Sequence, residues 1–287
     1  MNRSAHAFRK MNGLGNDFAV LDARQSGFRI DAEYARRIAD RVSGVGCDQV
    51  IVIELSREAD AFMRIYNPDG SEVTACGNAT RCVAALLAVE LGCSDVSIET
   101  GAGVLRAAVG GDGAVTVDMG PPRLGWSDIP LARAFDDTAT LDVSFDGGEA
   151  GELARPGAVN MGNPHCVFIV ADLERYDLAA IGPRIEHDPL FPERVNVSLV
   201  QVLAPDAIRL AVWERGAGLT RACGTAACAA AVTTARKGLT GRKVSVTLPG
   251  GNLAIEWRAE DDHILMTGPW QLDYEGVFEV DRAALAS

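Results

Sequence analysis

The stretch Ala75-Cys76-Gly77-Asn78-Ala79 returns later in the chain as Ala222-Cys223-Gly224-Thr225-Ala226. The two cysteines are 147 positions apart (223 − 76). Each stretch leads into an apolar run that ends near a glycine, which predicts helices over residues 77–91 and 224–237. Because both runs are apolar nearly all round, we expect these helices to be buried rather than to lie on a surface.

The repeat extends beyond the cysteines to other landmarks in the same order. The matching pairs are Asn16 with Asn163, Gln49 with Asn196, and Gly120-Pro121 with Gly268-Pro269. The first two pairs are again 147 apart and the last is 148 apart, which indicates one inserted residue. This pattern predicts two homologous halves, at about 8–121 and 155–270, joined by residues 122–154.

Short runs rich in β-branched and aromatic residues surround each predicted helix, as is typical of strands. They lie at 18–21, 50–53, 62–66, 96–99 and 105–109, and again at 167–170, 197–203, 208–213, 244–248 and 253–257. We therefore predict an α+β fold with two pseudo-symmetric lobes. Each lobe is expected to be a curved, mainly antiparallel sheet or barrel wrapped around a central helix, with the active site between the lobes.

The predicted lobes divide the chain into three parts. Residues 1–121 form the N-terminal lobe, which carries Cys76, and residues 122–270 form the C-terminal lobe, which carries Cys223. Residues 271–287 form a tail that we expect to return to the N-terminal lobe or to a dimer interface.

Composition limits the partners and the compartment. Hydrophobic residues make up 48% and charged residues 23% of the 287 residues, a balance that supports a globular core. A net charge of −12 disfavours nucleic acid as a partner. The first eleven residues lack the apolar core of a secretion signal, and no run approaches the roughly 20 apolar residues of a spanning helix. We expect no membrane association, a cytoplasmic location, and seven free thiols in that reducing compartment.

The positions of Cys76 and Cys223 suggest acid–base chemistry. The first turn of a helix has unpaired N–H groups and partial positive charge, which bind a carboxylate and lower a thiol pKa from about 8.5 toward neutrality. Two such helix ends facing each other would place a sulfur on either side of one α-carbon. One thiolate then removes the α-proton and the opposite thiol returns a proton to the other face, so the configuration inverts. The pattern favours an amino-acid racemase or epimerase that needs no cofactor.

The other cysteines fit no such role. We expect Cys82 and Cys228 to pack inside the helices, and we assign no chemistry to Cys47, Cys93 and Cys166. A zinc site would need cysteine pairs two to four residues apart, whereas five residues separate Cys76 from Cys82. A non-catalytic thiol or zinc-binding protein is the alternative outside catalysis.

Polar residues near the landmarks are candidates for substrate recognition. They are Asn16, Gln49, Asn67, Asn163 and Asn196, at strand ends or in loops where asparagine also forms turns. Glu214-Arg215 would grip an ammonium and a carboxylate, or would form an ordinary surface pair. His165 is either structural or a proton relay to a cysteine.

Several motifs together resemble the diaminopimelate epimerase family. They are Met11-Asn12-Gly13-Leu14-Gly15-Asn16-Asp17-Phe18, Asn67-Pro68-Asp69-Gly70-Ser71-Glu72, Cys76-Gly77-Asn78, Met161-Gly162-Asn163-Pro164-His165, Glu214-Arg215-Gly216-Ala217-Gly218 and Ala222-Cys223-Gly224-Thr225. The related proline racemases usually carry Cys-Gly-His at the first cysteine. This chain has Cys-Gly-Asn there, so it groups with the diaminopimelate enzymes.

The resemblance implies conversion of LL-2,6-diaminopimelate to the meso form, for lysine and peptidoglycan precursors, by a cytoplasmic homodimer without metal or pyridoxal phosphate. It implies that Cys76 and Cys223 are the acid/base pair and that His165 and Glu214 tune their thiols. The backbone N–H groups of Gly77, Asn78, Gly224 and Thr225 would bind the reacting carboxylate. The remaining substrate groups would be bound by Asn16, Gln49, Asn67, Asn163, Asn196, Glu214 and Arg215. Tyr274 resembles a position used in dimer contacts.

The chain departs from the family pattern just after each cysteine. Ala79 and Ala226 stand where the family often has glycine. Both replacements are small, so we expect the local geometry to survive. The alternative within this fold is a racemase or epimerase of another amino acid. The charged pair Glu214-Arg215 favours diaminopimelate, because its side chain ends in a second amino-acid group.

Overall fold

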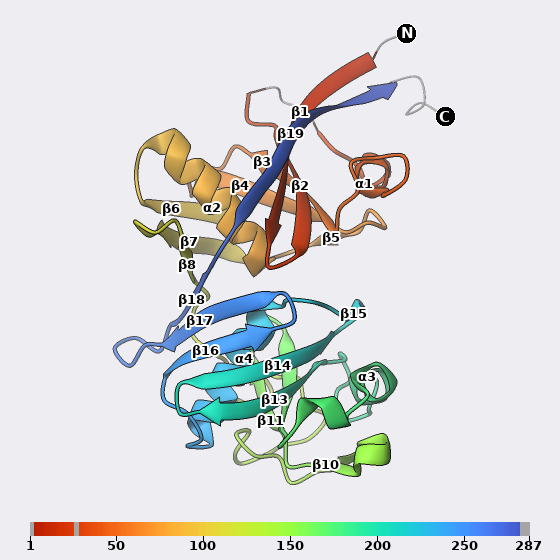
Figure 1. Ribbon diagram of the computed structural model, residues 1–287, viewed down its shortest axis with the longest axis vertical. Coiled ribbons are helices and arrows are strands. Elements are labelled where there is room, and N and C mark those ends of the chain that lie inside the picture. Colours follow the sequence, from red (N-terminus) through yellow and green to blue (C-terminus); the bar gives the residue numbers. More distant parts are fainter. Residues whose placement is uncertain (1–2, 26–28, 282–287) are drawn as a thin grey trace. The chain divides into compact units, whose positions relative to one another are not determined.

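The computed structural model describes residues 3–25 and 29–281. The chain divides into two compact units: unit 1 runs up to Val117 and resumes at Pro269, and unit 2 is Asp118–Gly268. The predicted tail, 271–287, is described as far as Asp281, and its residues 282–287 lie outside the described part, as do residues 1–2 and 26–28. Each unit is an α+β structure built mainly from strands, as the sequence predicts (Figure 1).

Unit 1 is built on a mixed sheet. Its strands are β1 (Arg3–Gly13), β2 (Asn16–Asp22), β3 (Gln49–Glu54), β4 (Ala61–Tyr66), β5 (Glu72–Val73), β6 (Asp95–Thr100), β7 (Gly103–Val109), β8 (Val115–Asp118) and β19 (Gln271–Asp281). The pairs β2–β3 and β4–β6 are parallel. The pairs β1–β19, β1–β2, β3–β4, β4–β5 and β6–β7 are antiparallel, so antiparallel pairing dominates as expected.

Unit 2 repeats this plan. Its strands are β9 (Ser144–Asp146), β10 (Glu152–Ala154), β11 (Gly157–Asn160), β12 (Pro164–Ile169), β13 (Asn196–Ala204), β14 (Ala207–Glu214), β15 (Gly218–Leu219), β16 (Lys243–Leu248), β17 (Gly251–Trp257) and β18 (Ile264–Gly268). The pairs β12–β13 and β14–β16 are parallel, like their counterparts in unit 1. Two short 3₁₀ helices, η1 (Gly148–Ala150) and η2 (Leu173–Arg175), lie in the connections.

The strand register confirms the repeat found in the sequence. Phe18 lies opposite Gln49 in β2–β3, and His165 lies opposite Asn196 in β12–β13, each residue shifted by 147. In the next pairs, Val50 lies opposite Tyr66 and Val197 opposite Trp213, again at 147. Residues at equivalent sequence positions therefore occupy equivalent places in the two sheets.

A buried helix lies against the sheet of each unit. The helices are α2 (Gly77–Leu91) in unit 1 and α4 (Gly224–Arg236) in unit 2. Helix α2 contacts β1, β2, β6 and β7, and α4 contacts β11 to β14 and β16 to β18. Gly92 ends α2 in a left-handed conformation with φ of 66°, as the sequence predicts. Cys82 and Cys228 are fully buried in these helices.

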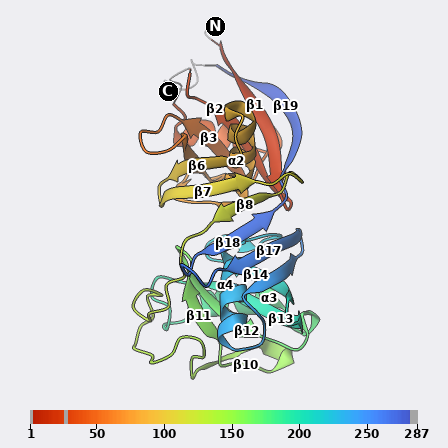
Figure 2. The same ribbon diagram turned by 90° about the vertical axis from the view of Figure 1, so that its left-hand side faces the viewer.

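Some elements were not anticipated from the sequence. They include the long strands β1 and β19, which pair along Arg3–Asn12 and Gln271–Asp281 and run side by side in Figure 2. They also include the helices α1 (Ala32–Ala39) and α3 (Leu178–Glu186), each of which begins after an aspartate cap. No helix in the described part of the chain has the length and apolar character needed to span a membrane.

Candidate functional site

Cys76 is the N-cap of α2, with extended backbone angles (φ −150°, ψ 108°). The Cys76 side chain makes no capping hydrogen bond to this helix. The thiol is half-buried, and its Sγ donates to Asn16 Oδ1 at 3.9 Å. Asn78, in the first turn, donates from Nδ2 to the same oxygen at 3.4 Å. The structure thus brings together three predicted site residues of unit 1.

The other end of the Asn16 amide is held by a carboxylate. Asn16 Nδ2 donates to Asp48 Oδ2 at 2.9 Å, and Arg41 bridges Asp48 and Asp17. The nearly buried Lys10 donates to Asp17 at 2.6 Å and also to the carbonyl of Gly46. Burial alone would raise the pKa of the Asp17 carboxyl, but the hydrogen bonds from Arg41 and Lys10 outweigh burial and hold this pKa well below its usual range.

Gln49 and Asn67 form a second polar contact in unit 1. Gln49 Nε2 donates to Asn67 Oδ1 at 3.2 Å, and Asn67 Nδ2 donates to Ser71 Oγ at 3.1 Å. The oxygen Oε1 of Gln49 is buried and has no hydrogen-bond partner among the described residues. A buried acceptor without a donor is costly, and an ammonium group would satisfy it.

Cys223 is the N-cap of α4 in unit 2, again with extended angles (φ −134°, ψ 114°) and no side-chain cap. The thiol is buried, and its Sγ lies 3.4 Å from Thr225 Oγ1. It also shares a hydrogen bond with the Glu214 carboxyl, which accepts a second, short one from the Thr220 hydroxyl. Burial raises the pKa of Glu214, while its bonds with Thr220 and Cys223 lower it.

The expected pKa of Cys223 is wrong for this structure. The helix terminus was expected to bring the thiol pKa toward neutrality. Instead, burial raises the pKa of Cys223 well above its usual value, and the nearby Glu214 carboxylate raises it further. The bonds from Thr225 and the Ala226 N–H lower this pKa but do not offset burial. Cys223 is therefore held as a neutral thiol, a proton donor, at neutral pH.

His165 is fully buried in β12 and bonds to a predicted site residue, not to a cysteine. Its Nε2 lies 2.8 Å from Asn163 Oδ1, so the ring donates there. Burial, and to a smaller extent the positive charge of Arg215, lower the pKa of His165 to about 3. A neutral imidazole that donates to Asn163 holds the amide in place. The predicted relay of protons to a cysteine has no contact supporting it within the described residues and stays a prediction.

The loop after β14 is held by buried acceptors. Asn196 Oδ1 accepts from the Arg215 backbone N–H at 3.0 Å, while its Nδ2 donates to the Pro164 carbonyl at 2.8 Å. Glu186, a buried carboxylate at the end of α3, accepts from the Gly216 N–H at 3.0 Å and from Trp213 Nε1 at 2.7 Å. These bonds fix the backbone that carries Glu214 and Arg215.

Several of these supporting residues escaped the sequence analysis. They are Lys10, Asp17, Arg41, Asp48, Glu186 and Thr220. The first-half aspartates stand beside repeated landmarks, Asp17 after Asn16 and Asp48 before Gln49. Their counterparts at offset 147 are Pro164 and Val195, so a search for repeated residues passes over them. An acidic residue adjacent to a repeated amide is the signal that would find them.

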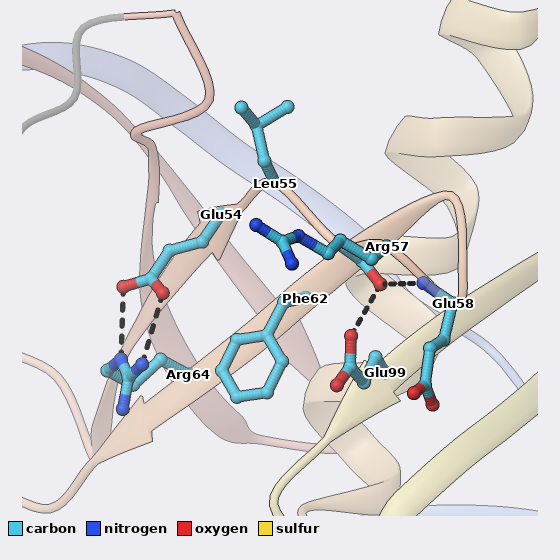
Figure 3. Close-up of a pocket in the computed structure, with 8 residues that line it drawn as sticks. Glu54, Leu55, Arg57, Glu58, Phe62, Arg64 and Glu99 are labelled. Carbon is cyan, nitrogen blue, oxygen red and sulfur yellow. Dashed lines mark hydrogen bonds and ion pairs between the residues drawn. The ribbon is translucent and has the colours of Figure 1, made fainter.

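A shallow pocket of about 340 Å³ in unit 1 is separate from these groups (Figure 3). It is lined by Glu54, Leu55, Ser56, Arg57, Glu58, Phe62, Arg64 and Glu99. Arg64 donates to both oxygens of Glu54, at 3.0 and 3.1 Å. None of the predicted site residues lines this pocket, so we do not place the site there.

Comparison with known proteins decides the family. The sequence model of the diaminopimelate epimerase family matches residues 8–125 and 157–272, two stretches close to the predicted halves. The chain belongs to the diaminopimelate epimerase family. The diaminopimelate epimerase of Rhodospirillum centenum is 56% identical over 271 residues, covering 94% of this chain and 91% of that protein. That of Acidiphilium cryptum is 53% identical over 283 residues, 99% of each chain.

A solved structure of a more distant protein has the same fold as this member of the diaminopimelate epimerase family. A hydroxyproline epimerase from Agrobacterium vitis aligns with a TM-score of 0.69 at 17% identity, covering 98% of this chain and 93% of that one. At that identity the likeness concerns the fold alone, and it agrees with the predicted two-lobed α+β architecture.

Proposed function

We propose that this protein is a diaminopimelate epimerase, an isomerase that interconverts LL-2,6-diaminopimelate and meso-2,6-diaminopimelate without a cofactor. The observation that carries the proposal is that each unit presents one cysteine as the N-cap of a buried helix with no side-chain cap. Relatives named diaminopimelate epimerase, more than 50% identical over nearly the whole chain, support the same substrate. The meso product would serve lysine and peptidoglycan precursors.

The uncapped helix ends would bind the carboxylate of the reacting centre. Backbone N–H groups of Gly77 and Asn78 in α2, and of Gly224 and Thr225 in α4, are the donors. As the α-proton leaves, negative charge moves onto this carboxylate. Donors already oriented toward it stabilise that charge without reorganisation, and such stabilisation is a large part of many enzymatic accelerations.

The proton would move between Cys76 and Cys223. A thiolate on one side takes the α-proton and becomes a thiol, while the thiol on the other side gives its proton to the α-carbon and becomes a thiolate. One C–H bond breaks and another forms, and the sulfur charges exchange places. Cys223 enters as the thiol in this structure, and Glu214 is the carboxylate placed to accept its proton when it must act as the base.

The other groups of the substrate would be read by polar side chains. In unit 1 these are Asn16, Gln49 and Asn67, and the unpartnered Oε1 of Gln49 is an acceptor suited to an ammonium. In unit 2 they are Asn163, Asn196, Glu214 and Arg215. Glu214 and Arg215 carry the charges that a distal ammonium and carboxylate require.

Exchange of the α-proton with solvent tests the proposal. Purified protein in D₂O is incubated with LL-diaminopimelate, L-proline or L-glutamate, and α-deuterium is followed by NMR. We expect deuterium incorporation and epimerisation with LL-diaminopimelate only. Exchange of proline or glutamate without LL-diaminopimelate would assign a racemase of another amino acid. No exchange with any of the three would reject catalysis.

We also propose that the protein is a cytoplasmic homodimer in which Tyr274 lies at the contact. Tyr274 lies on β19 with 50% of its surface exposed. Its ring packs edge-on against the ring of Phe8, with 5.9 Å between the two ring centroids. Leu272 and Val277 on the same strand are also exposed. Large apolar side chains exposed on one strand are suited to a protein contact.

A further inference from the structure

Asp48 ties together the starts of two neighbouring strands in unit 1. Its Oδ2 accepts from Asn16 Nδ2 at 2.9 Å and from the Asp17 backbone N–H at 3.0 Å. In return, the Asp48 backbone N–H donates to Asp17 Oδ1 at 2.9 Å. Asn16 begins β2, and Asp48 directly precedes β3. The amide of Asn16 is therefore bound to the residue that precedes the neighbouring strand.

The partners of Asp48 leave one orientation for the Asn16 amide. Arg41 Nη2 donates to the other carboxylate oxygen of Asp48, Oδ1, at 2.7 Å. Both oxygens of Asp48 therefore act as hydrogen-bond acceptors. A carboxylate paired with a guanidinium offers acceptors only. The NH₂ group of Asn16 must face it, and the carbonyl oxygen must point the other way, to Cys76 Sγ at 3.9 Å.

We propose that Asp48 is a positioning residue that turns the Asn16 amide so that its carbonyl oxygen, not its NH₂ group, faces the Cys76 thiol. A carbonyl oxygen accepts a hydrogen bond from a thiol S–H but cannot donate one to a thiolate. This orientation of the Asn16 amide therefore favours the protonated sulfur. With a flipped amide, an N–H would donate to the sulfur and favour the thiolate. The inference deepens the proposed function, on which its catalytic meaning rests.

Unit 2 has no carboxylate at the position equivalent to Asp48. The counterpart of Asp48 at offset 147 is Val195, and the counterpart of Asn16 is Asn163. The carbonyl of Asn163 is occupied by His165 Nε2 at 2.8 Å. Orientation by a carboxylate is thus specific to the Cys76 side and is not a general consequence of the repeated fold.

Other charged groups surround the network, and the test must separate their fields from the orientation of the amide. Lys10 of β1 and Asp17 of β2 form an ion pair at 2.6 Å, and Arg41 after α1 binds Asp17 at 2.9 Å. Arg81 of α2 donates to Asn78 Oδ1 at 2.9 Å. Removing the Asp48 charge alone would also favour a thiolate at Cys76, by loss of repulsion.

A double-mutant cycle makes this separation. Cys76 alkylation by iodoacetamide is followed against pH in the full-length protein without substrate, by mass spectrometry of the Cys76 peptide. We expect Asp48→Asn to move the alkylation midpoint down by about one pH unit. In the Asn16→Ala background, the same substitution should have a much smaller effect. Equal shifts in both backgrounds, or no shift in either, would overturn the proposal.

Matched variants complete the experiment. Asp60→Asn removes an aspartate that likewise accepts from a backbone N–H and a side chain, those of Ser97 at 2.7 Å each. Its midpoint should equal wild type, and a shift as large as that of Asp48→Asn would overturn the proposal. The Asp48 side chain is 41% exposed, so replacing it opens no buried cavity. Asp48→Ser should shift the midpoint in the same direction, and thermal unfolding reports folding of each variant.

The outcomes separate this inference from the proposed function. The pH dependence of α-proton exchange with LL-diaminopimelate should move in parallel with alkylation in Asp48→Asn. If wild-type protein exchanges no α-proton, the proposed function fails while the alkylation cycle still decides the role of Asp48. If exchange occurs and the cycle shows no coupling, the function stands and the role of Asp48 is rejected.

Discussion

Asn16 and Asn163 are equivalent residues of the two units, but a carboxylate binds the NH₂ group of Asn16 while a histidine ring binds the carbonyl oxygen of Asn163. Asn16 gives its NH₂ group to Asp48 at 2.9 Å, whereas Asn163 receives His165 Nε2 at its carbonyl oxygen at 2.8 Å. The repeated fold therefore carries two chemically different half-sites. Cys76 faces an amide carbonyl, and Cys223 is buried next to a carboxyl group.

Replacing Glu214 should change the acidity of Cys223. After burial, the Glu214 carboxylate is the next cause that raises the Cys223 pKa. Glu214→Gln removes that negative charge at nearly constant shape. The pH midpoint of Cys223 alkylation should fall by about one unit, while epimerisation drops roughly 100-fold because the proton acceptor is lost. An unchanged alkylation midpoint would mean that the carboxylate does not act on this thiol.

His165 should make the protein less stable in mild acid. The pKa of its imidazole is about 3 in the folded state, below the ordinary value of 6.5, because burial disfavours the charged ring. Between pH 6.5 and pH 3 the unfolded chain therefore binds a proton at His165 that the folded chain does not bind. The contribution of His165 to the free energy of unfolding is fully present above pH 6.5 and is lost progressively as the pH falls toward 3. By pH 5 the loss from this residue is about 2 kcal/mol.

Urea unfolding at pH 7.5 and pH 5 measures this effect. In His165→Asn the loss of stability between the two pH values should be smaller than in wild type by that amount. His187→Asn, which replaces an exposed histidine, is the control and should behave like wild type. Equal acid sensitivity in His165→Asn and wild type would contradict the burial argument.

Glu186 should support substrate binding from outside the site. Its carboxylate accepts from both Gly216 N and Trp213 Nε1, and a glutamine offers only one oxygen for the two donors. Glu186→Gln should loosen the loop that carries Arg215, raising KM for LL-diaminopimelate about tenfold with a smaller change in kcat. Glu174→Gln, at an exposed ion pair with Arg209, should leave both constants unchanged. A KM equal to wild type in Glu186→Gln would remove this role.

Tyr274→Glu tests the proposed dimer. A charge placed in a buried apolar contact costs several kcal/mol, so the variant should be monomeric in light scattering at a concentration where wild type is dimeric. Leu203→Glu changes a similarly exposed apolar residue of unit 2 and should remain dimeric. If Tyr274→Glu stays dimeric, the contact lies elsewhere.

The repeat made most of the fold predictable. The two cysteine motifs predicted helices α2 and α4, and the register pairs Phe18–Gln49 and His165–Asn196 follow the same offset. Strands β1 and β19 were missed, and the pairing between them joins segments that are distant in sequence. Their pairing depends on tertiary structure, which local patterns do not encode.

The sequence predicted the site residues that occur in both halves of the repeat. It did not predict several of those that occur in only one half. Asp48 and Glu186 have no counterpart of the same type in the other unit, so the repeat gives no signal for them. The acidity of Cys223 was predicted with the wrong sign because a sequence indicates the helix terminus but not the depth of burial. In this structure burial outweighs the hydrogen bonds from Thr225 and the Ala226 N–H, which lower the pKa of the Cys223 thiol.

The most direct test of the central claim is epimerisation of LL-diaminopimelate by Cys76→Ala and Cys223→Ala, with Cys93→Ala as the control at an exposed thiol. If two sulfurs share one α-carbon, each of the first two variants should lose about 100-fold or more of the wild-type rate, and Cys93→Ala should lose none. Wild-type epimerisation by either Cys76→Ala or Cys223→Ala would contradict the account.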